Sequence, residues 1–286
     1  MPELPEVETV RRGIAAHVVG RQIVRVDVGR ERTVRRTSRE ALIDGLTGTT
    51  ITAFGRRGKY LLGDLDSGDM VMVHLRMSGR LLMATATDPL EPHTHVVLHL
   101  ADIPDASQFQ SAQLRFIDPR TFGEVVVFDP SNTGVELPEL DRLGIDPITD
   151  GLSRQQFARL CAGRRRQLKP FLLDQHVVAG IGNIYCDEIL HAAKLRPDRL
   201  ADSLTATEVT RLHAHIHSIL NAAIAAGGST LSDTQYVDVM GNGGSFQLDH
   251  RVYDRAGLPC TTCARAVIVR TVSGGRSTCY CPRCQR

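Results

Sequence analysis

The 286-residue sequence contains no run of eighteen apolar residues, which is what a membrane-spanning helix requires. Its first residues, MPELPEVETVRR, include three glutamates and no apolar segment, so they resemble neither a secretory signal nor a transit peptide. Hydrophobic residues make up 42% of the chain and charged residues 23%, which is the balance of a globular protein. We therefore expect a soluble, cytoplasmic protein without a membrane partner.

Lysine is scarce and the net charge is small. Only three lysines occur among 34 basic residues, Lys59, Lys169 and Lys194, and a codon bias toward arginine explains that ratio. The formal net charge of +2 does not by itself indicate a nucleic-acid partner, so the distribution of charge has to be considered. Between Arg251 and Arg286 there are seven arginines and one acid, Asp254. This end of the chain is suited to bind a polyanion.

Seven cysteines are an odd number, and four of them form two C-x-x-C pairs separated by 17 residues. This spacing predicts one structural zinc ion in a tetrahedral site rather than disulfides. The expected ligands are Cys260, Cys263, Cys281 and Cys284. Cys279 could compete as a ligand or pack inside, and we expect it to pack.

Between the cysteine pairs, two strand-like segments flank Ser273-Gly274-Gly275, which favours a tight β-hairpin. A zinc-stapled hairpin can serve stability alone. Arg276, however, stands beside the glycine turn, where an arginine can enter a minor groove or bind a phosphate. The hairpin is therefore a candidate DNA-binding element as well.

The remaining pattern predicts an α+β protein. Apolar residues recur at helical spacing from Glu3 to Val18, and five strand-like segments without intervening helices then favour an antiparallel β-sandwich. A Pro-, Asn- and Gly-rich segment marks a linker, and helical patterns follow it. We expect a catalytic sandwich at 1–132, a linker at 133–150, a helical domain at 151–240, and a loop with the zinc hairpin at 241–286.

The N-terminus carries candidate chemistry. Removal of Met1 would leave Pro2 with a secondary α-amine, whose unperturbed pKa near 8 keeps much of it nucleophilic. Glu3 and Glu6 lie three residues apart at the head of the first helix, so both carboxylates can serve proton transfer near that amine. Acids in a first turn also favour the helix dipole, which is the simpler explanation of the spacing alone.

Six segments, in order, resemble signatures of the formamidopyrimidine-DNA glycosylases, also called 8-oxoguanine DNA glycosylases, which contain a helix-two-turn-helix domain. These segments are MPELPEVET, GRRGKYLL, HLRMSG, DPRTFG, GIGNIYCDE and the cysteine hairpin. The resemblance spans the whole chain. The leucine at position 4 resembles this branch of the family, because the related endonuclease VIII branch typically has glycine at that position.

The resemblance implies a role for each matching residue. It implies Pro2 as the nucleophile, Glu3 as the proton donor to the sugar, Glu6 as its support and Lys59 as a phosphate contact in the active site. It implies that Met77, Arg120 and Phe122 fill the space left by a flipped nucleotide. The residues expected to contact the DNA backbone are His74, His93, Lys169, Asn183, Tyr253 and Arg276.

Three positions depart from the family pattern. The hairpin is one residue longer than usual between the cysteine pairs, and Arg76 occupies a position often held by glycine. Ser232 replaces a basic residue of some relatives, close to the loop at 229–249 that is thought to cover the damaged base. This last departure bears on the preference among lesions.

The resemblance implies a monomeric bacterial enzyme, associated with the nucleoid through its DNA, that repairs oxidised purines by base excision. It would be a bifunctional glycosylase and abasic-site lyase that acts on damaged double-stranded DNA without a redox cofactor or catalytic metal. Two alternatives remain open: an endonuclease VIII-like enzyme for oxidised pyrimidines, and a paralogue that binds lesions without catalysis.

Overall fold

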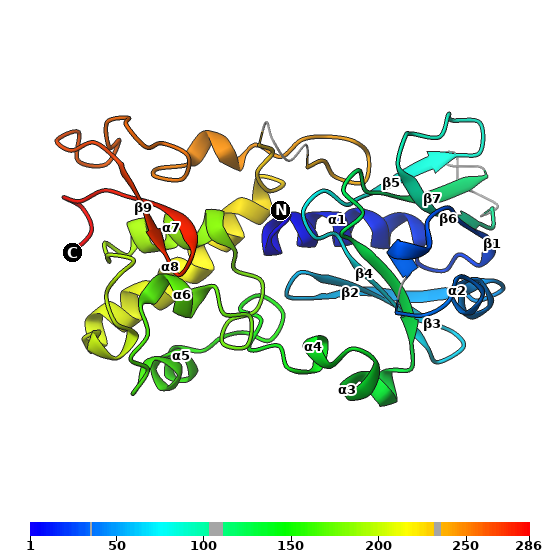
Figure 1. Ribbon diagram of the computed structural model, residues 1–286, viewed down its shortest axis with the longest axis horizontal. Helices are drawn as coiled ribbons and strands as arrows, with labels where there is room; N and C mark the ends of the chain where they lie inside the picture. Colours follow the sequence, from blue (N-terminus) through cyan, green and yellow to red (C-terminus); the bar gives the residue numbers. More distant parts are fainter. Residues whose placement is uncertain (35, 103–110, 232–235) are drawn as a thin grey trace. The chain divides into compact units, whose positions relative to one another are not determined.

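The computed structural model describes residues 1–34, 36–102, 111–231 and 236–286. The chain forms two compact units: the first contains residues 1–141 and 227–245, and the second contains 142–226 and 246–286 (Figure 1). These units differ from the boundaries expected from sequence. Residues 133–141 join the first unit through the short helices α3 (Thr133–Glu136) and α4 (Pro138–Asp141), and the chain returns to that unit after residue 226.

The first unit is built on two four-stranded antiparallel sheets, as expected. One sheet has the order β1-β6-β7-β5 and the other β2-β3-β4-β8 (Figure 1). The strands are β1 (Ile23–Val28), β2 (Ile51–Arg57), β3 (Tyr60–Leu65), β4 (Met70–His74), β5 (Arg80–Thr85), β6 (Thr94–Leu100), β7 (Ala112–Ile117) and β8 (Glu124–Phe128). Apolar side chains of both sheets share one core with α1 (Leu4–Val18), so the architecture is a sandwich with a helix packed on it.

Helix α1 confirms the period read from sequence. Val7, Val10, Ile14 and Val18 are all buried on its inner face. Helix α2 (Arg39–Leu46) adds Leu42 and Leu46 to the same core. This packing fixes the orientation of α1 and therefore the position of its N-terminal residues.

Three strands, β2, β3 and β5, were not expected from the sequence. In β2 a register shift between Ile51 and Ala53 interrupts the alternation of buried and exposed residues. Arg56 occupies a buried position of the same strand, where the period leads one to expect an apolar side chain. In β2 the two-residue period from which strands are read is thus broken by a bulge and a buried charge.

The second unit is helical, as expected, and ends in a β-hairpin. Its helices are α5 (Arg154–Cys161), α6 (Leu168–Leu172), α7 (Asn183–Ala192) and α8 (Ala206–Ala225), and its strands are β9 (Val269–Ser273) and β10 (Arg276–Tyr280). The capping box predicted at α8 is present, with Thr205 and Glu208 bonded to each other's backbone N–H groups. Short 3-10 helices occupy Glu31–Val34, Pro130–Asn132, Ala201–Ser203 and Phe246–Asp249.

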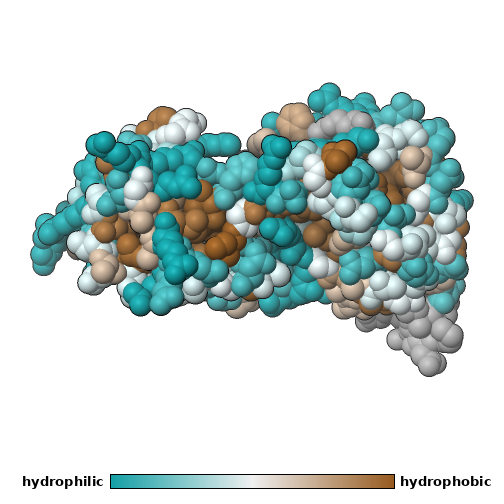
Figure 2. Space-filling model, turned by 90° about the horizontal axis from the view of Figure 1, so that it is seen from below, coloured by the Kyte–Doolittle hydropathy of each residue, from teal (hydrophilic) through white to brown (hydrophobic). Residues whose placement is uncertain are grey.

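The surface is mostly polar on the face seen in Figure 2. Hydrophilic residues surround separate hydrophobic patches there. Across the ranges that the structure describes, no helix has both the length and the apolar character needed to cross a bilayer.

Candidate functional site

The first turn of α1 brings together three of the predicted site residues. Pro2, Glu3 and Glu6 are all buried. The Glu6 carboxylate accepts the backbone N–H of Glu3 at 2.8 Å through Oε2 and the backbone N–H of Ser229 at 2.8 Å through Oε1. Glu6 therefore ties the head of α1 to the segment that follows α8.

Gly228 explains how that segment approaches so closely. A Cβ atom at this position would lie 2.7 Å from Glu6 Oε1, which is nearer than two such atoms can pack. Its φ of +81° also lies in the left-handed region that glycine adopts without strain. Glycine is thus required both for the turn and for the contact with Glu6.

Lys59 lies in the tight turn between β2 and β3, directly after Gly58. Arg56 fastens this turn to α1, because its guanidinium donates to Glu8 Oε2 at 3.0 Å and to the carbonyl of Gly58 at 2.8 Å. Burial alone would raise the pKa of Glu8, but hydrogen bonds from Arg11, Arg12 and Arg56 outweigh it and lower the pKa to about 2. A buried, ionised carboxylate on α1 therefore holds the Lys59 turn in place.

His74 stacks on Tyr60 with 4.3 Å between the ring centroids, and it is almost fully buried. Burial, together with the charges of Arg76, Lys59 and Arg36, holds the pKa of His74 well below its usual range. The imidazole is therefore neutral near pH 7. The positive charge around His74 therefore comes from Arg36, Arg76 and Lys59, and not from the imidazole itself.

Arg76 has a φ of +52°, which lies in the left-handed region that glycine adopts without strain. A non-glycine residue in this conformation costs on the order of 1 kcal/mol. Arg76 donates to the buried Glu124 at 3.0 Å, and Arg36 binds the second oxygen of Glu124 at 2.6 Å. The ion pair with Glu124 offsets this backbone cost and fixes the Arg76 side chain.

Met77, Arg120 and Phe122 lie on two loops of the first unit. Met77 is 41% exposed and Phe122 is 39% exposed, so both offer apolar surface to a partner. The Arg120 guanidinium carbon lies 5.1 Å from the centroid of the Phe122 ring, within the range of a cation–π contact. His93, on a neighbouring loop, is also exposed and has a φ of +67°.

Lys169 lies elsewhere than its predicted role suggests. Its side chain is fully buried in the second unit, where Nζ donates to Asp187 Oδ1 at 2.6 Å and to the carbonyl of Ser277 at 2.8 Å. Asp187 in turn accepts the backbone N–H of Cys279 at 2.9 Å. The ammonium thus holds strand β10 against α7, and a phosphate has no access to it in this structure.

Asn183 and Tyr253 both lie close to α7. Asn183 is the first residue of that helix, and its Oδ1 is buried without a hydrogen-bond partner among the described residues. Tyr253 is half-buried, and its backbone N–H donates to Glu188 of α7 at 2.8 Å. Glu188 also accepts the N–H groups of Arg251 and Val252, so a single carboxylate shapes this turn.

The four cysteines of the two C-x-x-C pairs come together as predicted. Their sulfur atoms all lie within 4.8 Å of one another. The sulfur–sulfur distance is 3.8 Å both from Cys260 to Cys284 and from Cys263 to Cys281. Four sulfurs at about 2.3 Å from one zinc ion are separated by about 3.8 Å, so the set fits tetrahedral zinc. Cys279 is buried in the adjoining apolar cluster and is not part of this group, as expected.

The hairpin has the predicted tight turn. Gly274 and Gly275 have φ values of +56° and +75°, and Ser273 pairs with Arg276 across them. A Cβ on Gly274 would lie 2.7 Å from Pro170 Cγ of α6, so the turn packs closely on the helical part of the unit. Arg276 is exposed and lines a hollow of about 320 Å³ together with Arg166 and His176.

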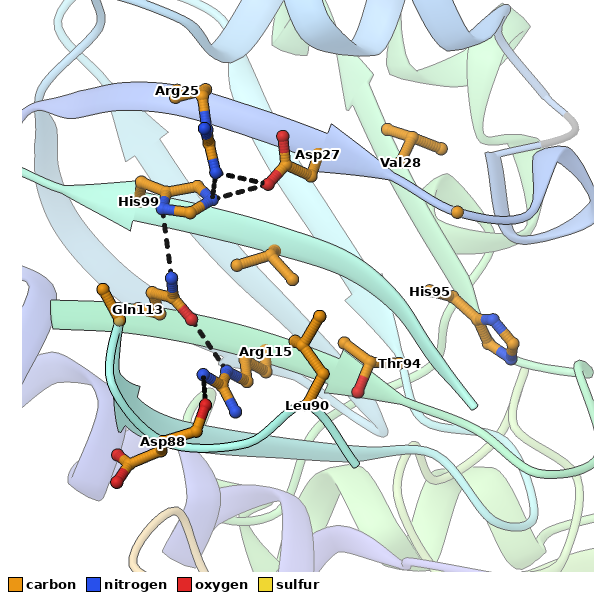
Figure 3. Close-up of a pocket in the computed structure, with 13 residues that line it drawn as sticks. Arg25, Asp27, Val28, Asp88, Leu90, Thr94, His95, His99, Gln113 and Arg115 are labelled. Atoms are coloured by element: carbon orange, nitrogen blue, oxygen red, sulfur yellow. Dashed lines mark hydrogen bonds and ion pairs between the residues drawn. The ribbon is translucent and has the colours of Figure 1, made fainter. Parts of the chain in front are cut away.

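The outer face of the sheet β1-β6-β7-β5 contains another hollow, of about 380 Å³ (Figure 3). Its polar side chains bond to one another in a chain: Arg115 donates to Gln113, which contacts His99, which contacts Asp27. None of the predicted site residues lines this hollow. The predicted site residues therefore lie elsewhere in the structure.

Three family models match consecutive parts of the chain. They are the formamidopyrimidine-DNA glycosylase N-terminal domain at residues 1–125, the H2TH domain of the same enzymes at 143–235, and a zinc finger found in FPG and IleRS at 257–286. The last match agrees with the geometry of the four cysteines and confirms the predicted zinc site.

Relatives and solved structures agree with these models. Formamidopyrimidine-DNA glycosylases of Desulforamulus reducens and Paracoccus denitrificans are 41% and 42% identical, with all of this chain and 99% and 100% of the relatives covered. A mutant Lactococcus lactis FPG bound to Fapy-dG containing DNA superposes with a TM-score of 0.88 at 34% identity, with both chains fully covered. The fold and site thus define a DNA glycosylase of base-excision repair. The chain belongs to the formamidopyrimidine-DNA glycosylase family.

Several residues that organise the site were not singled out from the sequence. Glu8, Arg56, Asp118, Asp187 and Glu188 are buried charged residues that hold functional segments in place. Asp118 belongs to the DPRTFG segment and Asp187 and Glu188 to GIGNIYCDE, so the signal was present in motifs already recognised. Ser232 and the neighbouring part of the 229–249 loop lie outside the described residues.

Proposed function

We propose that this glycosylase excises oxidised purines, 8-oxoguanine and formamidopyrimidines, from duplex DNA and then cleaves the emptied strand. The observation that carries the proposal is the cluster of Pro2, Glu3 and Glu6 at the buried head of α1, in which Glu6 is held by two backbone N–H groups. The relative solved with Fapy-dG containing DNA supports the choice of substrate. We further propose that the enzyme acts as a monomer on bacterial DNA in the cytoplasm, since the relatives are bacterial.

The reaction begins when removal of Met1 converts the Pro2 nitrogen from an amide into a secondary amine. Its lone pair attacks C1′ of the damaged nucleotide, and the bond from C1′ to the base breaks with its electrons leaving on the base. The amine proton is lost as the sugar ring opens, and an iminium forms between Pro2 and C1′. Because the nitrogen carries no further proton, this iminium persists as an electron sink.

Strand cleavage follows from the iminium. Loss of a C2′ proton expels the 3′ phosphate by β elimination, and loss of a C4′ proton expels the 5′ phosphate by δ elimination. Hydrolysis then releases the sugar remnant as an unsaturated aldehyde and restores the amine. The product is a one-nucleotide gap with phosphate on both sides.

Within this scheme Glu3 donates a proton to the sugar ring oxygen as the ring opens. Glu6 supports it by fixing the Glu3 backbone and the segment at Ser229. Lys59 contacts the phosphate beside the lesion from the turn that Arg56 fastens to α1. Each group therefore has a fixed position before the substrate arrives, which favours the transition state.

DNA is held by residues of both units. Met77, Arg120 and Phe122 fill the space of the flipped nucleotide, because inserted surface can repay the unstacking cost. The backbone contacts in the proposal are His74, His93, Asn183, Tyr253 and Arg276. Lys169 contributes indirectly, through the strand that carries Arg276, because its ammonium is bound to Asp187.

Borohydride trapping on an 8-oxoguanine duplex, followed by peptide mapping, tests the proposal. We expect one covalent adduct, at Pro2 of a chain that lacks Met1. A matched control carries an N-terminal extension that keeps the Pro2 nitrogen an amide, and it should bind the duplex without forming the adduct. An adduct at another residue, or an active preparation that retains Met1, would overturn the mechanism.

The second candidate substrate class is oxidised pyrimidines, and one solved relative supports it. The wild-type Lactococcus lactis FPG, with a TM-score of 0.87 at 34% identity, was solved with DNA containing an oxidised pyrimidine. Faster excision from the pyrimidine duplex than from the 8-oxoguanine duplex would support this alternative. Binding of either duplex without a trapped adduct would instead indicate a non-catalytic paralogue.

A further inference from the structure

Asp118 is a fully buried carboxylate between the two loops that carry Met77 and Phe122. Oδ1 accepts the hydroxyl of Ser78 at 2.5 Å and the backbone N–H of Arg120 at 3.2 Å. Oδ2 accepts the backbone N–H of Gly123 at 2.7 Å. The side chain thus shapes its own loop and binds the residue next to Met77 on the other loop.

The backbone of Asp118 connects a third loop. Its N–H donates to the carbonyl of His93 at 3.0 Å, and its own carbonyl contacts His95 Nε2 at 2.8 Å. The same carbonyl accepts the N–H of Thr121 at 3.2 Å. One residue therefore makes six hydrogen bonds that join the segments around residues 78, 93 and 120.

Each of these segments contains one non-glycine residue in the left-handed region. The φ values are +52° at Arg76, +67° at His93 and +53° at Thr121. Such conformations persist only where the surroundings hold them, and they cluster at functional sites. The hydrogen bonds of Asp118 reach the residue itself or a close neighbour in all three cases.

The loops that carry Met77 and Phe122 have exposed tips, whereas Asp118 at their base is buried. Met77 and Phe122 expose 41% and 39% of their surface, whereas Asp118 exposes 0%. The base is closely packed at Gly123, because a Cβ there would lie 2.5 Å from Phe116 Cζ. Apolar tips on a rigid base suit insertion into a duplex, since little order has to be gained on binding.

We propose that Asp118 is a positioning residue that, through Ser78, sets the spacing between Met77 and the Arg120–Phe122 pair so that both insert at the same base pair. The inference rests on the proposed function, because it concerns the insertion of Met77, Arg120 and Phe122 into the duplex. The simpler possibility is that Asp118 only stabilises its turn. The positioning role and the stabilising role make different predictions. Only the positioning role predicts that the loss of excision rate depends on how much unstacking the substrate requires.

The test compares Ser78→Ala, which removes only the link between the loops, with Ser67→Ala as the matched control. Ser67 is an exposed residue whose hydroxyl accepts the backbone N–H of Asp69 within its own turn. Ser78→Thr keeps the hydroxyl and should rescue the link. Asp118→Asn keeps the shape, but its amide cannot accept both sets of N–H and O–H donors.

Single-turnover excision is measured on two duplexes, with 8-oxoguanine opposite cytosine and opposite a tetrahydrofuran abasic analogue. On the paired duplex we expect Ser78→Ala and Asp118→Asn to be at least about tenfold slower than the wild type, as misplacement of a positioning element can cost up to about a hundredfold. Opposite the abasic analogue no partner base has to be displaced, so we expect rates within about twofold of the wild type.

The excision rates on the two duplexes distinguish a positioning role of Asp118 from a purely stabilising one. Recovery opposite the abasic analogue, with Ser67→Ala and Ser78→Thr normal on both duplexes, supports the positioning role. Equal slowing on both duplexes, or no slowing, overturns it, and a lowered melting temperature accompanied by equal slowing identifies Asp118 as a turn stabiliser. If the wild type excises no base from either duplex, the proposed function itself fails and not this inference.

Discussion

The ammonium of Lys169 and the carboxylate of Asp187 form a fully buried ion pair, with 2.6 Å between Nζ and Oδ1. Lys169→Met should therefore destabilise the second unit by about 3–5 kcal/mol, because it leaves a buried charge without a partner. Urea unfolding of both forms measures the difference. If Lys169 instead bound DNA directly, the variant would keep its stability and only weaken binding.

Gly228→Ala should disturb the active site. The added methyl would lie 2.7 Å from Glu6 Oε1 and displace the carboxylate that supports Glu3. We expect at least about a tenfold loss of borohydride-trapped adduct, since small displacements of catalytic groups are costly. Gly241→Ala is the matched control, because Gly241 also has a positive φ but no atom within 4 Å of its Cβ position. Equal losses in both variants would point to backbone strain alone.

Arg276→Ala should weaken binding to every duplex sequence by a similar factor. The Arg276 side chain is exposed beside the hairpin turn, and loss of the phosphate contact proposed for it should reduce the slope of log K against log salt by about 1. Titrations at several salt concentrations on two unrelated duplexes measure this. Arg154→Ala, at an exposed arginine at the start of α5, serves as the control. A loss confined to one sequence would contradict a phosphate contact.

Zinc content should follow the four-cysteine set and not Cys279. Elemental analysis should find one zinc per chain in the wild type and in Cys279→Ser, and a clear loss in Cys281→Ser, because Cys281 belongs to the cluster of four sulfurs and Cys279 does not. Chelation should also weaken DNA binding, since the metal closes the hairpin that presents Arg276. Loss of zinc from Cys279→Ser alone would contradict this ligand assignment.

Acid should destabilise the first unit through Glu8. Its pKa in the folded protein is lowered to about 2, below the usual value of 4.5, so the unfolded state binds more protons in between. The stabilisation is fully present above about pH 4.5 and is lost as the pH falls toward 2, with a total on the order of 3 kcal/mol. In Glu8→Gln this part of the pH dependence of unfolding should be absent. Parallel curves for the two proteins from pH 5 to 2 would rule it out.

Much of the fold could be read from the sequence because its signals are local. The helix from Glu3 to Val18, the capping box of α8 and the glycine turn of the hairpin each depend on residues a few positions apart. The three unexpected strands show where prediction from local patterns fails. The pattern of β2 is interrupted by a bulge at Ile51 and by the buried Arg56, whose charge is met by Glu8 from a distant part of the sequence.

By itself the sequence determined the zinc ligands and the family, since both are carried by motifs with a fixed spacing, and it also supplied the prediction of a nucleophile at the N-terminus. Only the tertiary structure decided that Lys169 is buried, that Glu6 binds the distant Ser229, and that Asp118 joins three loops. Residue type does not reveal whether a charged side chain meets solvent or a partner far along the chain. That choice depends on which elements pack together, and long-range packing sets it.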